Sequence, residues 1–163
     1  MGREPRLLGI YLNDHLAVAT ADLELARRTT RSHRGTPAAA VLGRLTGEID
    51  EDRAALARIM MVLGLPIRGY KISSGWLAEK IGRLKPNGHL LRRSPLTSVV
   101  ELEALRLGAE NRILVWTTLL AAAEADSRLD ASMLNGLLDR ARRHADEIDR
   151  LRLRAVSDLL CAR

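Results

Sequence analysis

The chain contains no phenylalanine, and it has only two tryptophans and two tyrosines. A hydrophobic core must therefore be built from leucine, alanine, isoleucine, valine and methionine. These residues favour helices packed against helices over sheets, whose strands are rich in aromatic and β-branched side chains. With 47% hydrophobic residues in a length of 163, the chain can bury one sizeable core. The sequence therefore predicts an all-α protein with a single domain over residues 1–163.

Four long stretches repeat apolar residues with helical spacing, and we expect helices at about 8–32, 37–63, 94–124 and 130–160. The first two stretches are separated by a short turn, as are the last two, so each pair is predicted to form an antiparallel hairpin. The connection between the hairpins, residues 65–93, is long enough to return along a helix of about 40 Å. Within it, Trp76 to Leu84 predicts one short amphipathic helix. The expected fold is a four-helix bundle with a long crossover.

Part of the crossover is strongly basic, in a chain whose net charge is +6. Residues 68–93 contain seven lysines and arginines, and Glu79 is the only acidic residue among them. Such a local excess suits an acidic partner or a membrane surface, and it also suits a solvated connection. The sequence gives no specific nucleic-acid signal, because it lacks a helix-turn-helix signature and stacking aromatic residues.

The remaining composition indicates where such a protein is found. Cys161 is the single cysteine, so no disulfide framework is expected. The first residues lack the apolar segment of a signal peptide, and no window reaches the length of a membrane span. We therefore expect a cytoplasmic protein. The 23 arginines against three lysines indicate a GC-rich bacterial genome.

Polar residues fall on the predicted inner face of every helix when the sequence is placed on helical wheels at 100° per residue. On the third helix the expected inner arc runs through Val99, Leu107, Leu114 and Ala121. The hairpin geometry places one acid or histidine from each helix at the same height; these four are Asp22, Glu48, Glu110 and His144. Further candidates on or near the inner faces are His15, Asp52, Glu103 and Glu147.

Buried carboxylates without partners cost several kcal/mol each, so something must neutralise this cluster. Metal ions are one solution, and raised pKa values that keep the carboxyl groups partly protonated are another. A third is a polar network in which histidines and neighbouring arginines satisfy the acids. Candidates for that network are His15, His144, Arg53, Arg140 and Arg152.

With two helical hairpins, a long crossover and one inward acid or histidine per helix, the chain resembles the ferritin-like superfamily, which includes ferritins and rubrerythrins. The resemblance implies a carboxylate-bridged di-iron or di-manganese site, formed by a Glu from the first and third helices and a Glu-x-x-His motif from the other two. Asp22 and Glu110 correspond to the two single glutamates. Glu48-x-x-Glu51 and His144-x-x-Glu147 occupy the motif positions, without a histidine in the former and in reversed order in the latter.

The expected function is therefore that of a ferritin-like bundle protein with an incomplete metal site and a binding or structural role. The alternative is an iron- or manganese-binding oxidoreductase or metal-storage protein that uses the inward carboxylates and histidines. We also expect a homodimer that forms through an outer helix face. Trp116 lies off the expected inner arc of its helix, which predicts that it faces a partner chain or the crossover.

Overall fold

The computed structural model describes residues 3–68 and 95–161. These residues form four helices and no strand: α1 (Arg3–Ser32), α2 (Ala39–Val62), α4 (Pro95–Ala123) and α5 (Ala131–Cys161). The all-α prediction is confirmed for this part of the chain. None of the helices in these ranges combines the length and the apolar character of a membrane span. The predicted helix at 76–84 and the basic stretch beyond Arg68 lie outside the described residues.

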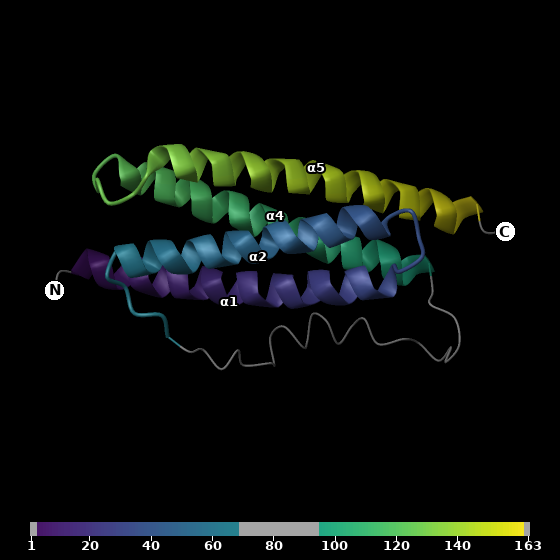
Figure 1. Cartoon of the computed structure of the whole chain (residues 1–163), viewed down its shortest axis with the longest axis horizontal. Helices are drawn as coiled ribbons and strands as arrows, with labels where there is room; N and C mark the ends of the chain where they lie inside the picture. The colour runs from purple at the N-terminus through teal and green to yellow at the C-terminus, as the bar shows by residue number, and fades with distance from the viewer. Residues whose placement is uncertain (1–2, 69–94, 162–163) are drawn as a thin grey trace.

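The four helices lie alongside one another in an elongated bundle (Figure 1). Along α1 and α2, Thr30 contacts Thr46 near one end, whereas the Asn13 side chain donates to the Pro66 carbonyl near the other. These two helices therefore run in opposite directions. Figure 1 also shows that α2 ends at one end of the bundle and that α4 begins at the opposite end.

Local sequence signals account for the helix ends. Gly64, directly after α2, has φ 69°, a left-handed conformation that glycine adopts without a steric penalty. It lets the Leu65 N–H donate to the Met60 carbonyl at 2.9 Å, which satisfies a carbonyl at the end of the helix. At the start of α5, the Asp130 carboxylate accepts from the Met133 N–H at 3.0 Å, as an N-cap does.

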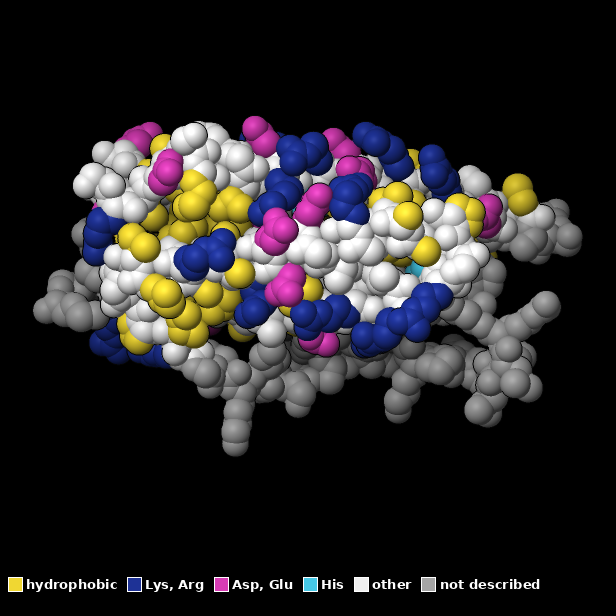
Figure 2. Space-filling model, viewed as in Figure 1, with side chains coloured by type: hydrophobic (Ala, Val, Ile, Leu, Met, Phe, Trp, Pro, Cys, Tyr) yellow, Lys and Arg dark blue, Asp and Glu magenta, His cyan; other side chains and the backbone are white. Residues whose placement is uncertain are grey.

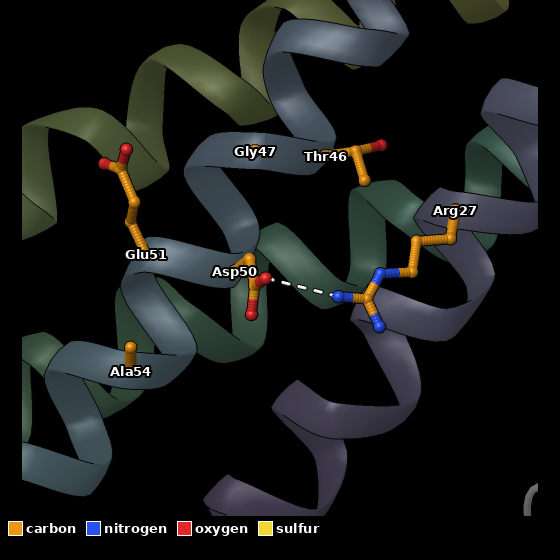
Figure 3. Close-up of a pocket in the computed structure, with 6 residues that line it drawn as sticks. All are labelled: Arg27, Thr46, Gly47, Asp50, Glu51 and Ala54. Atoms are coloured by element: carbon orange, nitrogen blue, oxygen red, sulfur yellow. Dashed lines mark hydrogen bonds and ion pairs between the residues drawn. The ribbon is translucent and has the colours of Figure 1, made fainter.

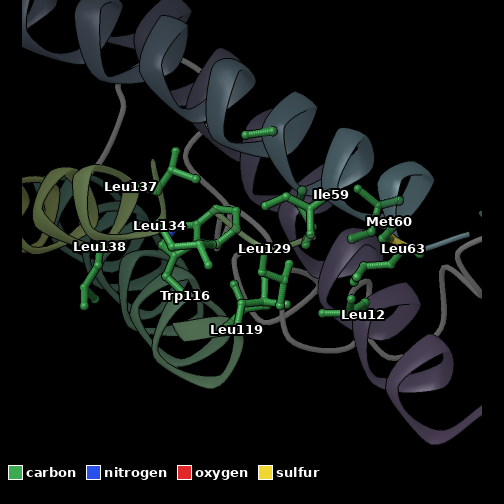
Figure 4. Close-up of a cluster of buried hydrophobic side chains, with 14 of the residues drawn as sticks. Leu12, Ile59, Met60, Leu63, Trp116, Leu119, Leu129, Leu134, Leu137 and Leu138 are labelled. Carbon is green, nitrogen blue, oxygen red and sulfur yellow. The ribbon is translucent and has the colours of Figure 1, made fainter. Parts of the chain in front are cut away.

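Two clusters of buried aliphatic side chains fill the bundle, one toward each end. One lies toward the end where α2 finishes and is drawn in Figure 4; its members include Trp116, Leu12, Met60, Leu119 and Leu134. Trp116 is only 1% exposed, so the expectation that it faces a partner or the crossover is wrong. The second cluster is built without aromatic residues, from side chains that include Leu23, Leu45, Ile49, Leu105 and Ile148.

The predicted inner face of α4 is wrong except at Val99, which is buried. Leu107 and Leu114 are 65% and 60% exposed, and Glu103 and Ala121 also face outward. The buried side is formed by Leu102, Leu105, Ala109, Arg112, Trp116 and Leu119. Because α4 carries apolar residues around its whole circumference, a helical wheel gives no unique inward direction for it. Packing against the other helices selects the face.

Charged and apolar side chains are unevenly distributed on the surface. Figure 2 shows hydrophobic side chains gathered toward the end of the bundle where α2 finishes, and interleaved basic and acidic side chains along the rest of that face. Met61 and Val62, the last residues of α2, are among the exposed apolar side chains. Arg27 illustrates the interleaving, since it pairs with Glu24 at 2.7 Å and with Asp50 at 3.2 Å. The arginines on this face are thus largely balanced by acids.

Candidate functional site

Arg112, on α4, is the central charged residue of the bundle interior and is only 2% exposed. Its Nη1 donates to Asp22 Oδ2 on α1, and its Nε lies 3.5 Å from Asp52 Oδ2 on α2. Its Nη2 lies 3.5 Å from His144 Nδ1 on α5. One guanidinium group therefore contacts all three other helices at the same height, between the two apolar clusters.

Asp22 is held at a point where α1 and α4 approach closely, opposite Gly108. A Cβ atom added at Gly108 would lie 2.2 Å from Asp22 Oδ1, far inside van der Waals contact. A glycine here leaves room for the carboxylate to reach Arg112. Burial raises the pKa of Asp22 above its ordinary value, while the charge of Arg112 and its hydrogen bond act in the opposite direction.

Asp52 is clamped by an arginine from α5. Arg140 Nε and Nη2 donate to Asp52 Oδ1 at 2.9 and 2.5 Å, and Arg140 Nη1 donates to Glu51 at 2.8 Å. The Asp52 side chain is fully buried, and this burial raises its pKa to about 6 despite the two nearby guanidinium groups. The two arginines beside this buried carboxylate come from two other helices, α4 and α5, and their charges compensate it.

His144 joins the interior charges to the surface. Its Nε2 lies 2.5 Å from Glu48 Oε2, and its Nδ1 faces Arg112, which has only hydrogens to donate. A neutral ring with its proton on Nε2 satisfies both contacts. Burial lowers the pKa of His144, in agreement with that neutral form. Burial alone would raise the pKa of Glu48, but hydrogen bonds from His144 and Arg44 bring it below the ordinary value.

These contacts form one connected group, the central charge network, made of Asp22, Glu48, Asp52, Arg112, Arg140 and His144. Three carboxylates face two guanidinium groups and a neutral imidazole, and Arg44 adds a third positive charge at the Glu48 edge. Every helix of the bundle contributes at least one member. Because the side chains of Asp22, Asp52 and Arg112 are buried, the loss of one of these charges leaves a buried charge with fewer partners. The network can therefore fix the relative height of the four helices.

Of the residues predicted for the site, Asp22, Glu48, Asp52 and His144 do belong to the network. Glu110 does not: it lies on the outer side of α4, 45% exposed, and pairs with Arg106 at 2.5 Å. Glu103, His15 and Glu147 lie elsewhere. Glu103 is exposed, Glu147 pairs with Arg44, and His15 lies beside the ring of Tyr11 with a centroid distance of 4.3 Å. The inward positions predicted for Glu103 and Glu110 are wrong, for the reason given above for α4.

The donor set does not fit a di-iron or di-manganese centre. No group of three or more histidine, cysteine, aspartate or glutamate side chains is gathered for a metal ion within residues 3–68 and 95–161. The buried carboxylates of Asp22 and Asp52 are instead held by guanidinium groups, whose positive charge lies where a cation would be needed. Among the residues that the sequence suggested for a polar network, Arg140 and His144 belong to the central charge network. Arg53 instead pairs with Asp50, and Arg152 pairs with Asp149.

Arg112 is the functional residue that the sequence reasoning missed. A signal for it exists in the spacing of the buried residues of α4, which alternate by three and four: 102, 105, 109, 112, 116 and 119. Arg112 occupies one of these positions, where a single polar residue sets the register of packed helices. The second possible repeat on α4, through Leu107 and Leu114, concealed this pattern.

A groove lies on the outside of α1 and α2 (Figure 3). It is lined by Arg27, Thr46, Gly47, Asp50, Glu51 and Ala54. Figure 3 shows Arg27 directed across it toward Asp50, with which it forms an ion pair. Arg27 and Asp50 pair with each other and Glu51 pairs with Arg140, so this groove does not present a second site.

Comparisons with known proteins assign no relative to this architecture. The sequence matches no protein-family model, no curated protein and no solved structure.

Proposed function

We propose that this protein is a ferritin-like four-helix bundle in which the central charge network stands in the place of a metal centre, and that it serves a binding or structural role. The observation that carries the proposal is the position of Arg112 between Asp22 and Asp52. In the ferritin-like architecture, carboxylates from facing helices hold metal ions in the bundle interior. Here the corresponding carboxylates are neutralised by arginines.

Two features of the fold support the ferritin-like part of the proposal. The α1–α2 and α4–α5 pairs are each joined by a short turn, and α2 and α4 run in the same direction along the bundle (Figure 1). That connectivity requires a long crossover between the hairpins, as in ferritin-like folds and unlike a simple up-down-up-down bundle.

Metal analysis tests the proposal directly. We expect protein that is expressed with added iron or manganese and purified without chelator to carry neither metal in stoichiometric amount. We also expect its melting temperature to be unchanged by Mn²⁺ or, under anaerobic conditions, by Fe²⁺, because a ligand stabilises only the state that binds it. Stoichiometric metal that is lost in Asp22→Ala would overturn the proposal and favour the oxidoreductase or storage alternative. Glu110→Ala serves as the matched variant, since Glu110 lies outside the network.

A further inference from the structure

The residues that follow Gly64 are held against α1 by one buried asparagine. Asn13 is only 4% exposed, and its Nδ2 donates to the Pro66 carbonyl at 3.0 Å. Its Oδ1 accepts from the Arg68 N–H at 2.8 Å. Nδ2 also donates to the Gly9 carbonyl, one turn earlier on α1, at 2.7 Å, which fixes the orientation of the amide. Both amide hydrogens and the amide oxygen are therefore used.

The hydrogen bonds to Pro66 and Arg68 go to backbone groups on either side of Ile67, as the bonds from a neighbouring β-strand would. An asparagine inside a helix is a poor helix former, because its side chain competes for backbone groups. Here the side chain instead supplies hydrogen-bond partners to an extended piece of chain, whose backbone groups need them. The pairing contacts no side chain of that piece, so it fixes where the backbone lies.

The chain that leaves α2 runs in the direction of α1, opposite to that of α2. Leu65 is 6% exposed and lies over Gly9, where an added Cβ atom would be 3.5 Å from Leu65 Cδ2. Arg68 lies one helical turn further along α1, at Asn13. Gly64, with φ 69°, makes the reversal without a steric penalty. The chain has therefore turned back toward the end of the bundle where α4 begins (Figure 1).

We infer that Asn13 is a latch that holds residues 65–68 extended against α1 and can release them while the four helices stay folded. Release is local, because the hydrogen bonds of the amide go to backbone groups of this segment and of its own helix. Once released, the chain at Arg68 becomes a substrate for trypsin-like proteases. The latch is separate from the central charge network, so this inference can fail while the metal analysis succeeds, and the reverse is also true.

Hydrogen exchange measured by NMR on the full chain tests the holding of the segment. In the wild type, the Nδ2 protons of Asn13 should exchange more slowly than those of Asn135, an exposed asparagine that also donates to the carbonyl four residues earlier on its helix. Asn13→Ala should speed exchange of the Arg68 N–H at least about tenfold, in keeping with the loss of two hydrogen bonds. Asn135→Ala is the matched control and should leave Arg68 unchanged. Equally fast exchange at Asn13 and Asn135 in the wild type would overturn the inference without any variant.

Limited proteolysis with trypsin tests the release. Cleavage of a folded protein follows the population in which the cut segment is free. We expect Asn13→Ala to yield the fragment 1–68, identified by mass spectrometry, about tenfold faster than the wild type and Asn135→Ala do. The helical circular dichroism of all three proteins should be the same. Equal rates of cleavage after Arg68, or a loss of helix in Asn13→Ala, would show that Asn13 is not a local latch.

Discussion

On the inner face of α4, Arg112 is 2% exposed, whereas Leu107 and Leu114 on the outer face of the same helix are 65% and 60% exposed. On this helix a charged side chain is therefore buried while two apolar side chains are exposed. The inner face can hold an arginine because Asp22 and Asp52 lie beside it, whereas the outer face holds leucines that are mostly exposed. The difference indicates that carboxylates on α1 and α2 determine which side of α4 faces inward, while no described helix covers the leucines on its outer side.

The largest effect should follow from removing the inner charge. Arg112→Met leaves Asp22 and Asp52 buried without their shared partner, and we expect the free energy of unfolding at neutral pH to fall by about 3–5 kcal/mol. Urea unfolding at a fixed protein concentration measures it. Arg142→Met, on the exposed side of α5, is the control and should change the value by less than about 0.5 kcal/mol. Equal losses for the two variants would mean that the interior contacts do not hold the bundle together.

The second effect is the pH dependence that Asp52 gives to the free energy of unfolding. Its pKa in the folded protein is about 6, against 3.8 as the ordinary value, so the folded state binds the proton more tightly than the unfolded state. The stability that this protonation contributes is complete below about pH 4 and is lost as the pH rises to about 6. Across this window, the stability of the wild type relative to Asp52→Asn should decrease by up to about 3 kcal/mol.

Unfolding of both proteins at a series of pH values between 4 and 7 checks this prediction. Burial lowers the pKa of His144, so its contribution to the free energy of unfolding decreases as the pH falls below 6.5. Both proteins contain His144, so this opposite contribution cancels when their stabilities are compared. A difference between the two proteins that stays constant or grows with rising pH would contradict a raised pKa at Asp52.

The smallest of the three effects is expected at Gly108, on the inner side of α4, where α1 and α4 approach each other closely. Gly108→Ala gains helix propensity, about 1 kcal/mol, but its Cβ atom would overlap the Asp22 carboxylate. We expect a net loss of about 2 kcal/mol, typical of overpacking at a close contact. Gly136→Ala on α5 has no neighbour within 4 Å and should instead stabilise the protein by up to about 1 kcal/mol. Should both substitutions stabilise, the close approach at Gly108 would have no energetic consequence.

The sequence named every member of the network except Arg112, and it predicted the inner face of α4 incorrectly. On α1, α2 and α5 the apolar residues occupy one side, so the inward positions of Asp22, Asp52 and His144 could be predicted from the spacing alone. On α4 two repeats compete, one through Leu107 and Leu114 and the other through Leu105, Ala109 and Trp116, and spacing alone does not decide between them. Arg112 lies on the second repeat, where its charge compensates the buried carboxylates of Asp22 and Asp52.

By itself, the sequence determined that this chain forms long helices, where most of them end, and which sides of three of them are buried. These properties depend on neighbouring residues along the chain: apolar spacing, Gly64 after α2 and Asp130 before α5. The tertiary structure alone decided the rotation of α4. Burying an arginine is favourable only when carboxylates from other helices compensate its charge. Those contacts join residues as far apart in sequence as Asp22 and Arg112.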